Sequence, residues 1–409
     1  IGVIGNGAVS KTLTDAGVGE CDLLIALTGS DELNILSCLL AKQLGAGSTI
    51  ARVRNPEYNN DLRLIKDSLG LTMAVNPERE AAAEIQRILK FPTARNVDIF
   101  GHGKVDLLSF VANKNCNLCD KAIKDSFAKI KTKALVCAIE RGDDVFIPTG
   151  DFVIKEHDTV AVLTPEKTAP DFFKQIGFRT THVKDIMIIG GGKIAVYLAK
   201  SLSHLNVNAT IVEKDLDTAL NLSYNLPNIN VVHGDGTNRS LLLEEGLKKA
   251  DAFCCLTGID EENIVLSLFA KSVNHDIKTI TKVNHTLFRE VIRTLDIDSV
   301  VYPKFTTASI ILKHVRSKAA RGGFSGVEKL TRIINNKVEA IEFQVSEESA
   351  VANHTLQELS LRPNILLGSI TRDNDVIIPS GSDVLEPGDS VVVVTSTERL
   401  TTLDDILQQ

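Results

Sequence analysis

The strongest chemical signal in the sequence is a glycine-rich turn between an apolar run and a helical pattern. Gly190 ends the strand-like run at 185–190, Gly192 follows it, and the next segment has apolar residues at helical spacing. The first glycine permits a tight turn, the second lets the backbone approach a pyrophosphate, and Ala195 in the third position permits close helix–strand packing. A phosphate would lie at the helix N-terminus, where unbonded N–H groups favour anions.

Polar residues at the ends of the following predicted strands extend this site. Glu213 ends the next strand, 21 residues after Gly192, where a carboxylate binds ribose hydroxyls and disfavours a 2′-phosphate. NAD or an adenine nucleotide is therefore favoured over NADP. Asp235 and Thr257 end the third and fourth strands, at the crevice where doubly wound sheets bind ligands, and Asp235 would either cap the next helix or hold the ligand. The alternative is a glycine turn that serves packing alone.

The chain contains the same unit twice. Residues 3–36 align with 232–265 without a gap, and matching segments recur further along both halves. A repeat of about 230 residues is far longer than a solenoid repeat, so we interpret it as a duplicated two-domain module. Because Ile1 aligns with Asn230, the first copy lacks the equivalent of the opening segment of the second. We expect that an N-terminal half-domain is missing, the alternative being a degenerate first copy.

Short apolar runs alternate with helical patterns in both copies, which predicts parallel sheets covered by helices on both faces. The predicted fold class is α/β, with two Rossmann-like doubly wound domains, the first N-terminally incomplete, each followed by a small α+β domain. The first copy should begin at its third strand. We expect helices near 60–69, 117–129 and 355–360, and domains at 1–92, 93–178, 179–322 and 323–409.

Two arginines of the first copy form a second candidate phosphate site. Arg52 and Arg54 stand at i and i+2 on a predicted strand and so share a face, where they would clamp phosphates or serve an interface; the alternative is a surface salt bridge. Lys282 and Asn284 are their nearest equivalents in the second copy. Asn6 stands where the second copy has an aspartate.

Composition excludes several classes of function. A net charge of −7, 5% aromatic residues and no tryptophan argue against nucleic-acid binding, and no apolar run is long enough to span a bilayer. Cys116 and Cys119 form the only CxxC pair, without further ligands at suitable spacing, so no metal site is predicted. No acid–base set accompanies the glycine loop, so we predict no catalytic residues; an NAD-dependent oxidoreductase with duplicated Rossmann domains remains the alternative.

The motifs GGGKIA, VEKD, HGDG and LTGIDEEN, followed by IPSGSDVLEPGDSVVVV and all duplicated, closely resemble the TrkA family. ARVRNPEY at 51–58 is a further near-signature, and the resemblance covers essentially the whole chain. It implies RCK domains of a cytoplasmic regulatory subunit of Trk potassium-uptake systems, peripheral on the inner face of the cell membrane. It further implies self-association into a dimer or tetrameric ring on an integral-membrane potassium-transport subunit. Binding of NAD(H), ATP or ADP would then control potassium flux.

The resemblance also implies ligand residues. They are Gly190, Gly192, Glu213, Asp235 and Thr257 in the second copy and Asn6, Thr28, Arg52 and Arg54 in the first, and the predicted set further includes Lys193, Ile194, Lys214, Gly236 and Gly258. Two departures matter. The glycine loop and ribose acid of the first copy are absent from this sequence, so its pocket cannot be complete here, and Ala195 replaces the last glycine of the family's loop.

Overall fold

The computed structural model describes residues 2–59, 70–178, 183–203, 207–285, 289–319, 327–334, 337–373, 375–396 and 400–408. The chain divides into two compact units. The N unit comprises Ile1–Gln86 and Lys184–Ala308, and the C unit comprises Arg87–Val183 and Ser309–Gln409. The helix predicted near 60–69 lies outside the described residues.

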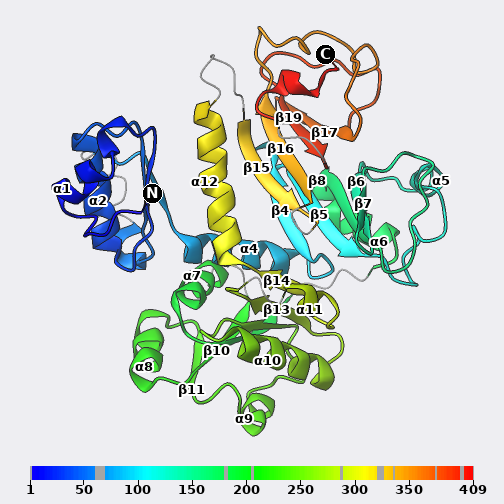
Figure 1. The fold of residues 1–409 in the computed structure, drawn as a ribbon. Helices are drawn as coiled ribbons and strands as arrows, with labels where there is room; N and C mark the ends of the chain where they lie inside the picture. The colour runs from blue at the N-terminus through cyan, green and yellow to red at the C-terminus, as the bar shows by residue number, and fades with distance from the viewer. Residues whose placement is uncertain are drawn as a thin grey trace. The chain divides into compact units, whose positions relative to one another are not determined.

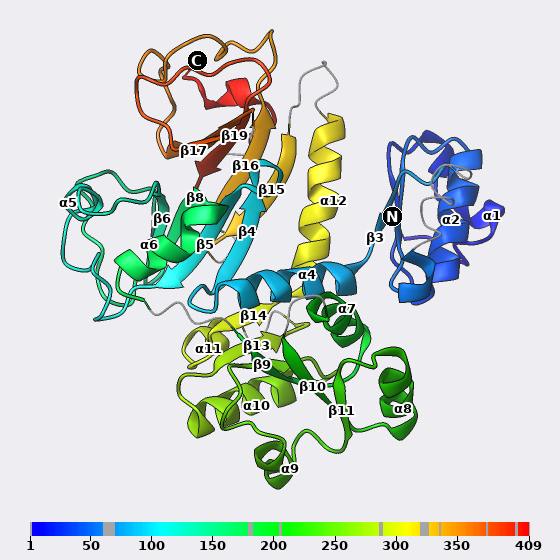
Figure 2. The ribbon, with the colours of Figure 1, turned by 180° about the vertical axis from the view of Figure 1, so that it is seen from behind.

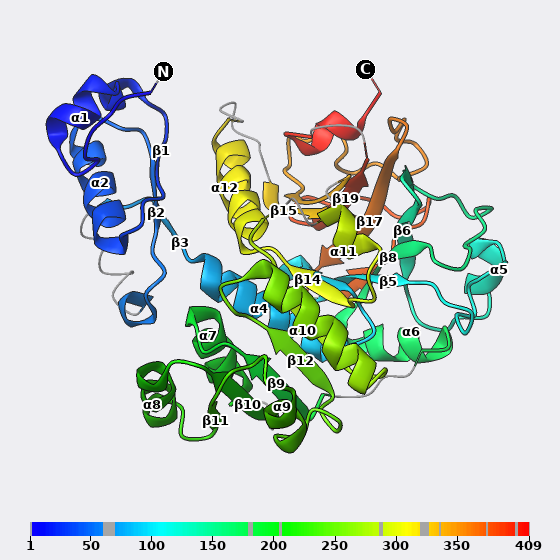
Figure 3. The ribbon, with the colours of Figure 1, turned by 60° about the horizontal axis from the view of Figure 1, so that its bottom comes forward.

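The second copy's part of the N unit is a six-stranded parallel sheet with the strand order β11-β10-β9-β12-β13-β14. The strands are β9 Asp185–Ile189, β10 Asn208–Glu213, β11 Asn230–His233, β12 Ala252–Cys255, β13 Lys278–Lys282 and β14 Ser299–Val301. The helices are α7 Lys193–Leu202, α8 Leu216–Asn225, α9 Arg239–Glu244, α10 Asp260–Val273 and α11 Arg289–Arg293. Helix α10 lies along β12 (Figure 3). This strand order is that of doubly wound dinucleotide-binding sheets, so the fold predicted for this copy is confirmed.

Local capping residues set where the helices of this sheet begin and end. The carboxylate of Asp215 accepts a hydrogen bond from Thr218 N at 2.8 Å and caps α8. The side chain of Asn238 does the same for α9. Helix α9 ends at Glu244, and Gly246, with φ +98°, then turns the chain out of the helical direction.

The first copy's part of the N unit is a three-stranded parallel sheet, β1-β2-β3, equivalent to β12-β13-β14. Its elements are α1 Ser10–Asp15, β1 Leu24–Ala26, α2 Asp31–Gln43, β2 Thr49–Arg52 and β3 Met73–Val75. The prediction that this copy begins at its third strand is wrong: residues 2–4 form no strand, and Ile4 is fully exposed. The equivalent strand β11 pairs with β10, and the described part of the first copy contains no counterpart of β10.

The C unit contains two antiparallel sheets with the same topology, β4-β5-β8-β6-β7 and β15-β16-β19-β17-β18. The first has β4 Asn96–Phe100, β5 Val105–Val111, β6 Leu135–Arg141, β7 Asp144–Phe146 and β8 Thr159–Pro165, with helices α5 Ile123–Phe127 and α6 Ala169–Gln175. The second has β15 Val327–Ile333, β16 Val338–Gln344, β17 Ile365–Arg372, β18 Asp375–Ile377 and β19 Ser390–Thr395. Strands β4 and β5 lie beside β15 and β16 (Figures 1 and 2). The sheets share one apolar core, in which Leu107 and Leu163 pack with Ala340 and Val394.

Two helices, α4 Pro77–Lys90 and α12 Pro303–Ala319, carry the chain from the N unit to the C unit. Each begins with a proline, whose fixed φ suits the first helical position and whose missing N–H would have no partner there. Helix α4 follows the last parallel strand of the first copy and α12 follows that of the second, so the connecting helices are duplicated as well.

Each antiparallel domain contains, at the same position, an ion pair between a buried aspartate and a partly exposed arginine. Asp158 accepts a hydrogen bond from Arg141 Nε at 2.9 Å, and Asp389 accepts one from Arg372 Nε at 2.8 Å. Both aspartates are 1% exposed, and each lies just before the strand that ends its copy's repeated motif. The paired carboxylate raises the pKa of each arginine, so both charges are retained in the folded domain.

The prediction of a helix near 355–360 is wrong. Leu356 N and Gln357 N donate to Asp383 O at 3.0 Å and Gly381 O at 2.9 Å. Their backbone groups are bonded across to another segment, which leaves them unable to form successive helical bonds, and the segment is a turn.

Candidate functional site

The glycine loop between β9 and α7 has the backbone geometry of a phosphate-binding turn. Gly190 has φ +96°, and a Cβ atom there would lie 3.1 Å from Thr257 N, so both its conformation and its surroundings require glycine. Gly192 precedes the first residue of α7 and has φ −68°. A Cβ atom on Gly192 would meet nothing within 4 Å, so its surface is open to a ligand.

Glu213 is held directly beneath this loop. Its Oε2 accepts from Gly191 N at 2.6 Å, and its Oε1 accepts from Asp215 N at 2.8 Å. A Cβ atom on Gly191 would lie 2.3 Å from Leu222 Cδ1, so any side chain there would require Leu222 to move. The acid and the loop are therefore in direct contact, and the carboxylate orients the loop through a backbone N–H.

An ion pair links the ends of β10 and β11. Lys214 Nζ lies 2.9 Å from Asp235 Oδ2, and Thr237 donates to the same carboxylate through N and Oγ1. The lysine's hydrogen bond holds the pKa of Asp235 well below its usual range. Asp235 does not cap α9, since Asn238 does, so the helix-capping alternative is wrong. The next residue, Gly236, approaches the sheet closely: a Cβ atom there would lie 2.3 Å from Ile189.

Asn263 fixes the end of β12, and sequence reasoning assigned it no role. Its Oδ1 accepts from Thr257 N at 2.9 Å, and its Nδ2 donates to Thr257 O at 3.2 Å and to Lys282 O at 3.0 Å. This side chain, which is 0% exposed, ties the ends of β12 and β13 together. Burial lowers the pKa of Lys282, whose ammonium donates to Leu256 O. The alignment of Asn34 with Asn263 in the repeat is the sequence signal that could have identified this residue.

The first copy has the same framework with different charges. Asn34 Oδ1 accepts from Thr28 N, and its Nδ2 donates to Arg52 O at 2.9 Å. Arg52 Nη2 donates to Thr28 O at 2.6 Å, and Arg54 Nε pairs with Asp31 at 3.1 Å. The structure therefore brings Thr28, Arg52 and Arg54 together, with both guanidinium groups bonded to oxygens of their own copy.

The remaining predicted residues are less tightly grouped. Asn6 bonds within its own turn, accepting from Ala8 N at 2.9 Å. Ile194 is 6% exposed, so only its backbone N–H at the start of α7 is available to a ligand. Lys193 is the first residue of α7, and Gly258 lies in the loop after β12.

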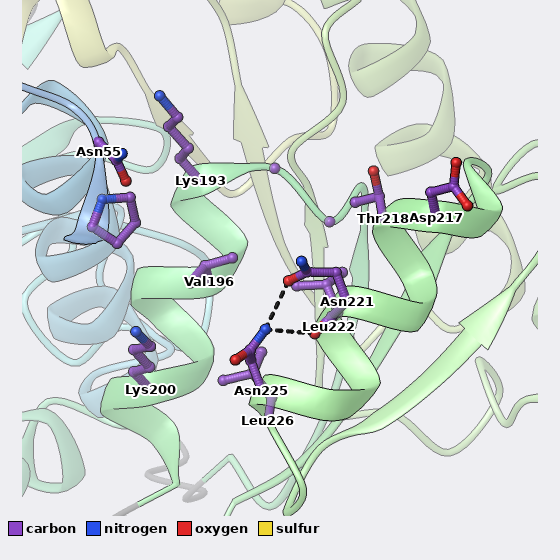
Figure 4. Close-up of a pocket in the computed structure, with 13 residues that line it drawn as sticks. Asn55, Lys193, Val196, Lys200, Asp217, Thr218, Asn221, Leu222, Asn225 and Leu226 are labelled. Carbon is purple, nitrogen blue, oxygen red and sulfur yellow. Dashed lines mark hydrogen bonds between the residues drawn. The ribbon is translucent and has the colours of Figure 1, made fainter. Parts of the chain in front are cut away.

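A cavity of about 610 Å³ lies beside the glycine loop, in the groove between α7 and α8 (Figure 4). Gly191, Gly192 and Lys193 line it, as do Asn55 and Pro56 of the first copy. Glu213, Asp235 and Thr257 do not line this cavity. The crevice at the carboxyl ends of the strands is the site favoured by the loop geometry, because there the N-terminus of α7 faces a ligand.

Comparison with known proteins identifies the family. The TrkA-N domain matches residues 2–77 and 186–303, and the TrkA-C domain matches residues 107–177 and 340–408. The chain belongs to the TrkA family. It is 30% identical to the Trk system potassium uptake protein TrkA homolog 1 of Methanosarcina mazei, over 95% of this chain and 86% of that protein. It is also 30% identical to the TrkA protein of Halomonas elongata, over 97% of this chain and 86% of that protein.

Solved structures show the same fold. The GsuK RCK domain superposes with a TM-score of 0.61 at 20% identity, covering 96% of this chain and 82% of that one. The GsuK channel bound to NAD gives 0.59 at 20% identity, covering 98% and 70%. TrkA proteins are regulatory potassium-uptake proteins and not enzymes, so the oxidoreductase alternative is set aside. No described helix has the length and apolar character needed to cross a bilayer.

Proposed function

We propose that this TrkA-family chain is a nucleotide-binding regulatory subunit that controls potassium flux through a Trk-type integral-membrane partner. NAD(H), ATP or ADP binds the second copy at the carboxyl ends of β9, β10 and β12. The observation that carries the proposal is the open surface of Gly192 above a loop oriented by Glu213. The relative named as a channel bound to NAD supports the ligand class through its shared fold.

The ligand-contacting residues proposed for this site have separate roles. The N–H groups of the glycine loop, with Lys193 and Ile194 at the start of α7, bind phosphates; Glu213 binds ribose hydroxyls; and Lys214, Asp235, Gly236, Thr257 and Gly258 line the crevice. In the first copy Asn6, Thr28, Arg52 and Arg54 are the corresponding contacts. A ligand controls the assembly only through different affinities for its two states.

The assembly and its location belong to the same proposal. The chain self-associates into a dimer or tetrameric ring, lies in the cytoplasm and is peripheral on the membrane through its potassium-transport partner. The four proposed domains are 1–92, 93–178, 179–322 and 323–409.

Calorimetric titration of the full chain with NAD⁺, NADH, ATP and ADP tests the binding step. We expect at least one to bind and Glu213→Ala to weaken it by roughly a hundredfold, because two charge-assisted hydrogen bonds to ribose are lost at about 1.5 kcal/mol each. Asp276→Ala, which replaces an exposed carboxylate just before β13 at the amino ends of the strands, is the matched control and should bind normally. Absence of binding by all four ligands would refute the proposed function.

Regulation is tested separately, by rubidium uptake in cells that lack other potassium uptake and express the chain with its Trk membrane subunit. Glu213→Ala should remove the response of uptake to the bound nucleotide while leaving the protein level unchanged. Normal regulation by that variant would show that the second-copy site is not the sensor.

A further inference from the structure

Asp106 on β5 is a buried carboxylate. The residue is 1% exposed, and neither of its oxygens has a partner in the described part of the chain. It shares a face of β5 with Leu108 and Phe110, which belong to the apolar core of the first antiparallel domain. Burial raises the pKa of this carboxyl group to about 6, because the charged form loses its hydration.

The duplication provides an internal comparison. Asp106 lies opposite Ile99 on β4, and Glu339, at the equivalent place on β16, lies opposite Arg332 on β15. Arg332 Nη2 is 3.1 Å from Glu339 Oε1, and its Nε donates to the same oxygen at 3.2 Å. Both copies therefore have an acid at this position, but the first has an isoleucine where the second has the arginine that pairs with it.

The charged groups that face Asp106 are engaged elsewhere. They are Lys90 at the end of α4, Glu166 directly after β8, and Lys329 on β15 of the second domain. Lys90 pairs with Glu166, and Lys329 Nζ donates to the carbonyl oxygen of Ile99. The two lysines favour the ionised form and Glu166 opposes it, but none of the three donates a hydrogen bond to the carboxylate.

We propose that Asp106 is a proton-binding site of the C unit, neutral at mildly acidic pH and ionised at higher pH. When the proton is released to solvent, an unpaired negative charge is left in the core next to the strand that Lys329 contacts. The ionised state therefore weakens the packing of β4 and β5 and draws Lys90 and Lys329 toward the new charge. This site is independent of nucleotide binding and gives the paired antiparallel domains a response to pH.

The sign of the effect on stability follows from proton linkage. The folded-state pKa lies above the unfolded value of about 3.9, so the folded chain binds more protons in the interval between them. The contribution of Asp106 to stability is fully present below about pH 4 and is lost as the pH rises through about 6. The Glu339–Arg332 pair, with its charge already matched, should not behave in this way.

Carboxyl ¹³C NMR of the full chain labelled at aspartate Cγ tests the proposal, with Asp106→Asn identifying the resonance. We expect one resonance to titrate near pH 6 in the wild type and to be missing from the variant. Ile99→Arg, which supplies the partner present in the second copy, should move that midpoint below about 4. A midpoint at or below about 4 in the wild type would overturn the proposal.

Thermal unfolding between about pH 4 and about pH 8 gives an independent readout. Asp106→Asn should raise the Tm at the upper end of this range relative to the wild type and remove the fall in Tm around pH 6. Glu339→Gln is the matched control: it should lower the Tm above about pH 4 without removing that fall. A wild-type profile that does not change when Asp106 is replaced would also overturn the proposal.

Discussion

Substitution of Gly192 by alanine separates a ligand-binding loop from a loop that serves packing alone. The glycine precedes α7 with φ −68° and ψ −178°, a conformation that alanine adopts without strain. A Cβ atom there would have no neighbour within 4 Å, so the fold has room for it. The same methyl group would occupy the surface through which a phosphate reaches the backbone N–H groups at the start of α7.

The expected magnitudes differ sharply between folding and binding. For folding, the change costs at most about 1 kcal/mol, the difference between glycine and alanine at an N-cap. For binding, displacing the phosphate removes two charge-assisted hydrogen bonds of about 1.5 kcal/mol each, a loss of roughly a hundredfold in affinity. Gly190→Ala is less informative, because φ +96° and the 3.1 Å approach to Thr257 N predict damage to the fold as well.

Calorimetric titration with NAD⁺ or ADP at fixed salt, together with thermal unfolding of the free protein, measures both quantities. Gly150→Ala is the control, since its Cβ atom would make only an ordinary 3.5 Å contact with Lys124 Cβ and lies in the C unit. Gly192→Ala should bind weakly with a nearly unchanged Tm, whereas the control should bind normally. Unchanged affinity in Gly192→Ala would refute the assignment of phosphate binding to this loop.

Two further predictions concern the framework. Asp158→Ala and Asp389→Ala should each lower the free energy of unfolding in urea by roughly 3 kcal/mol, because each leaves an arginine that is about two-thirds buried without its carboxylate partner. Asp151→Ala removes an exposed ion pair and should cost under about 1 kcal/mol. Equal effects of all three substitutions would contradict the reasoning. Asn263→Leu should lower the free energy of unfolding by about 2–4 kcal/mol, because three hydrogen bonds are lost. It should also weaken nucleotide binding, since Thr257 N loses its partner. A stable variant with normal binding would show that this side chain does not position the crevice.

The arrangement of the candidate nucleotide site in the second copy was predictable from the sequence because its signals are local. A glycine turn, the helix after it and Glu213 at the next strand end are fixed by spacing alone, and the structure brings them into hydrogen-bond contact. The partners of Arg52 and Arg54 were not predictable in this way. Their hydrogen bonds go to Thr28 O and to Asp31, which lie on a neighbouring segment of the sheet and depend on its register.

The antiparallel domains show where local patterns fail. Helix α6 (Ala169–Gln175) was not predicted, although Phe172 and Phe173 are both buried in the core of its domain. A seven-residue helix is too short to give a clear helical period, and its stability comes from those tertiary contacts. The shared core of the two sheets is likewise set by side chains that meet only after the domains fold.

The repeat also separates framework from chemistry inside one chain. Asp31 and Asp260 each accept two backbone N–H bonds from the residues that follow β2 and β13, so identical residues at this position hold the strand ends. The last residue of the strand differs between the copies. Arg52 at the end of β2 donates to two carbonyl oxygens, whereas Lys282 at the end of β13 is half-buried and donates to one. Two crevices with one backbone geometry thus carry different side-chain charges. Because the charge at a crevice affects which phosphate groups it favours, we expect the proposed sites of the two copies to differ in their preference among nucleotides.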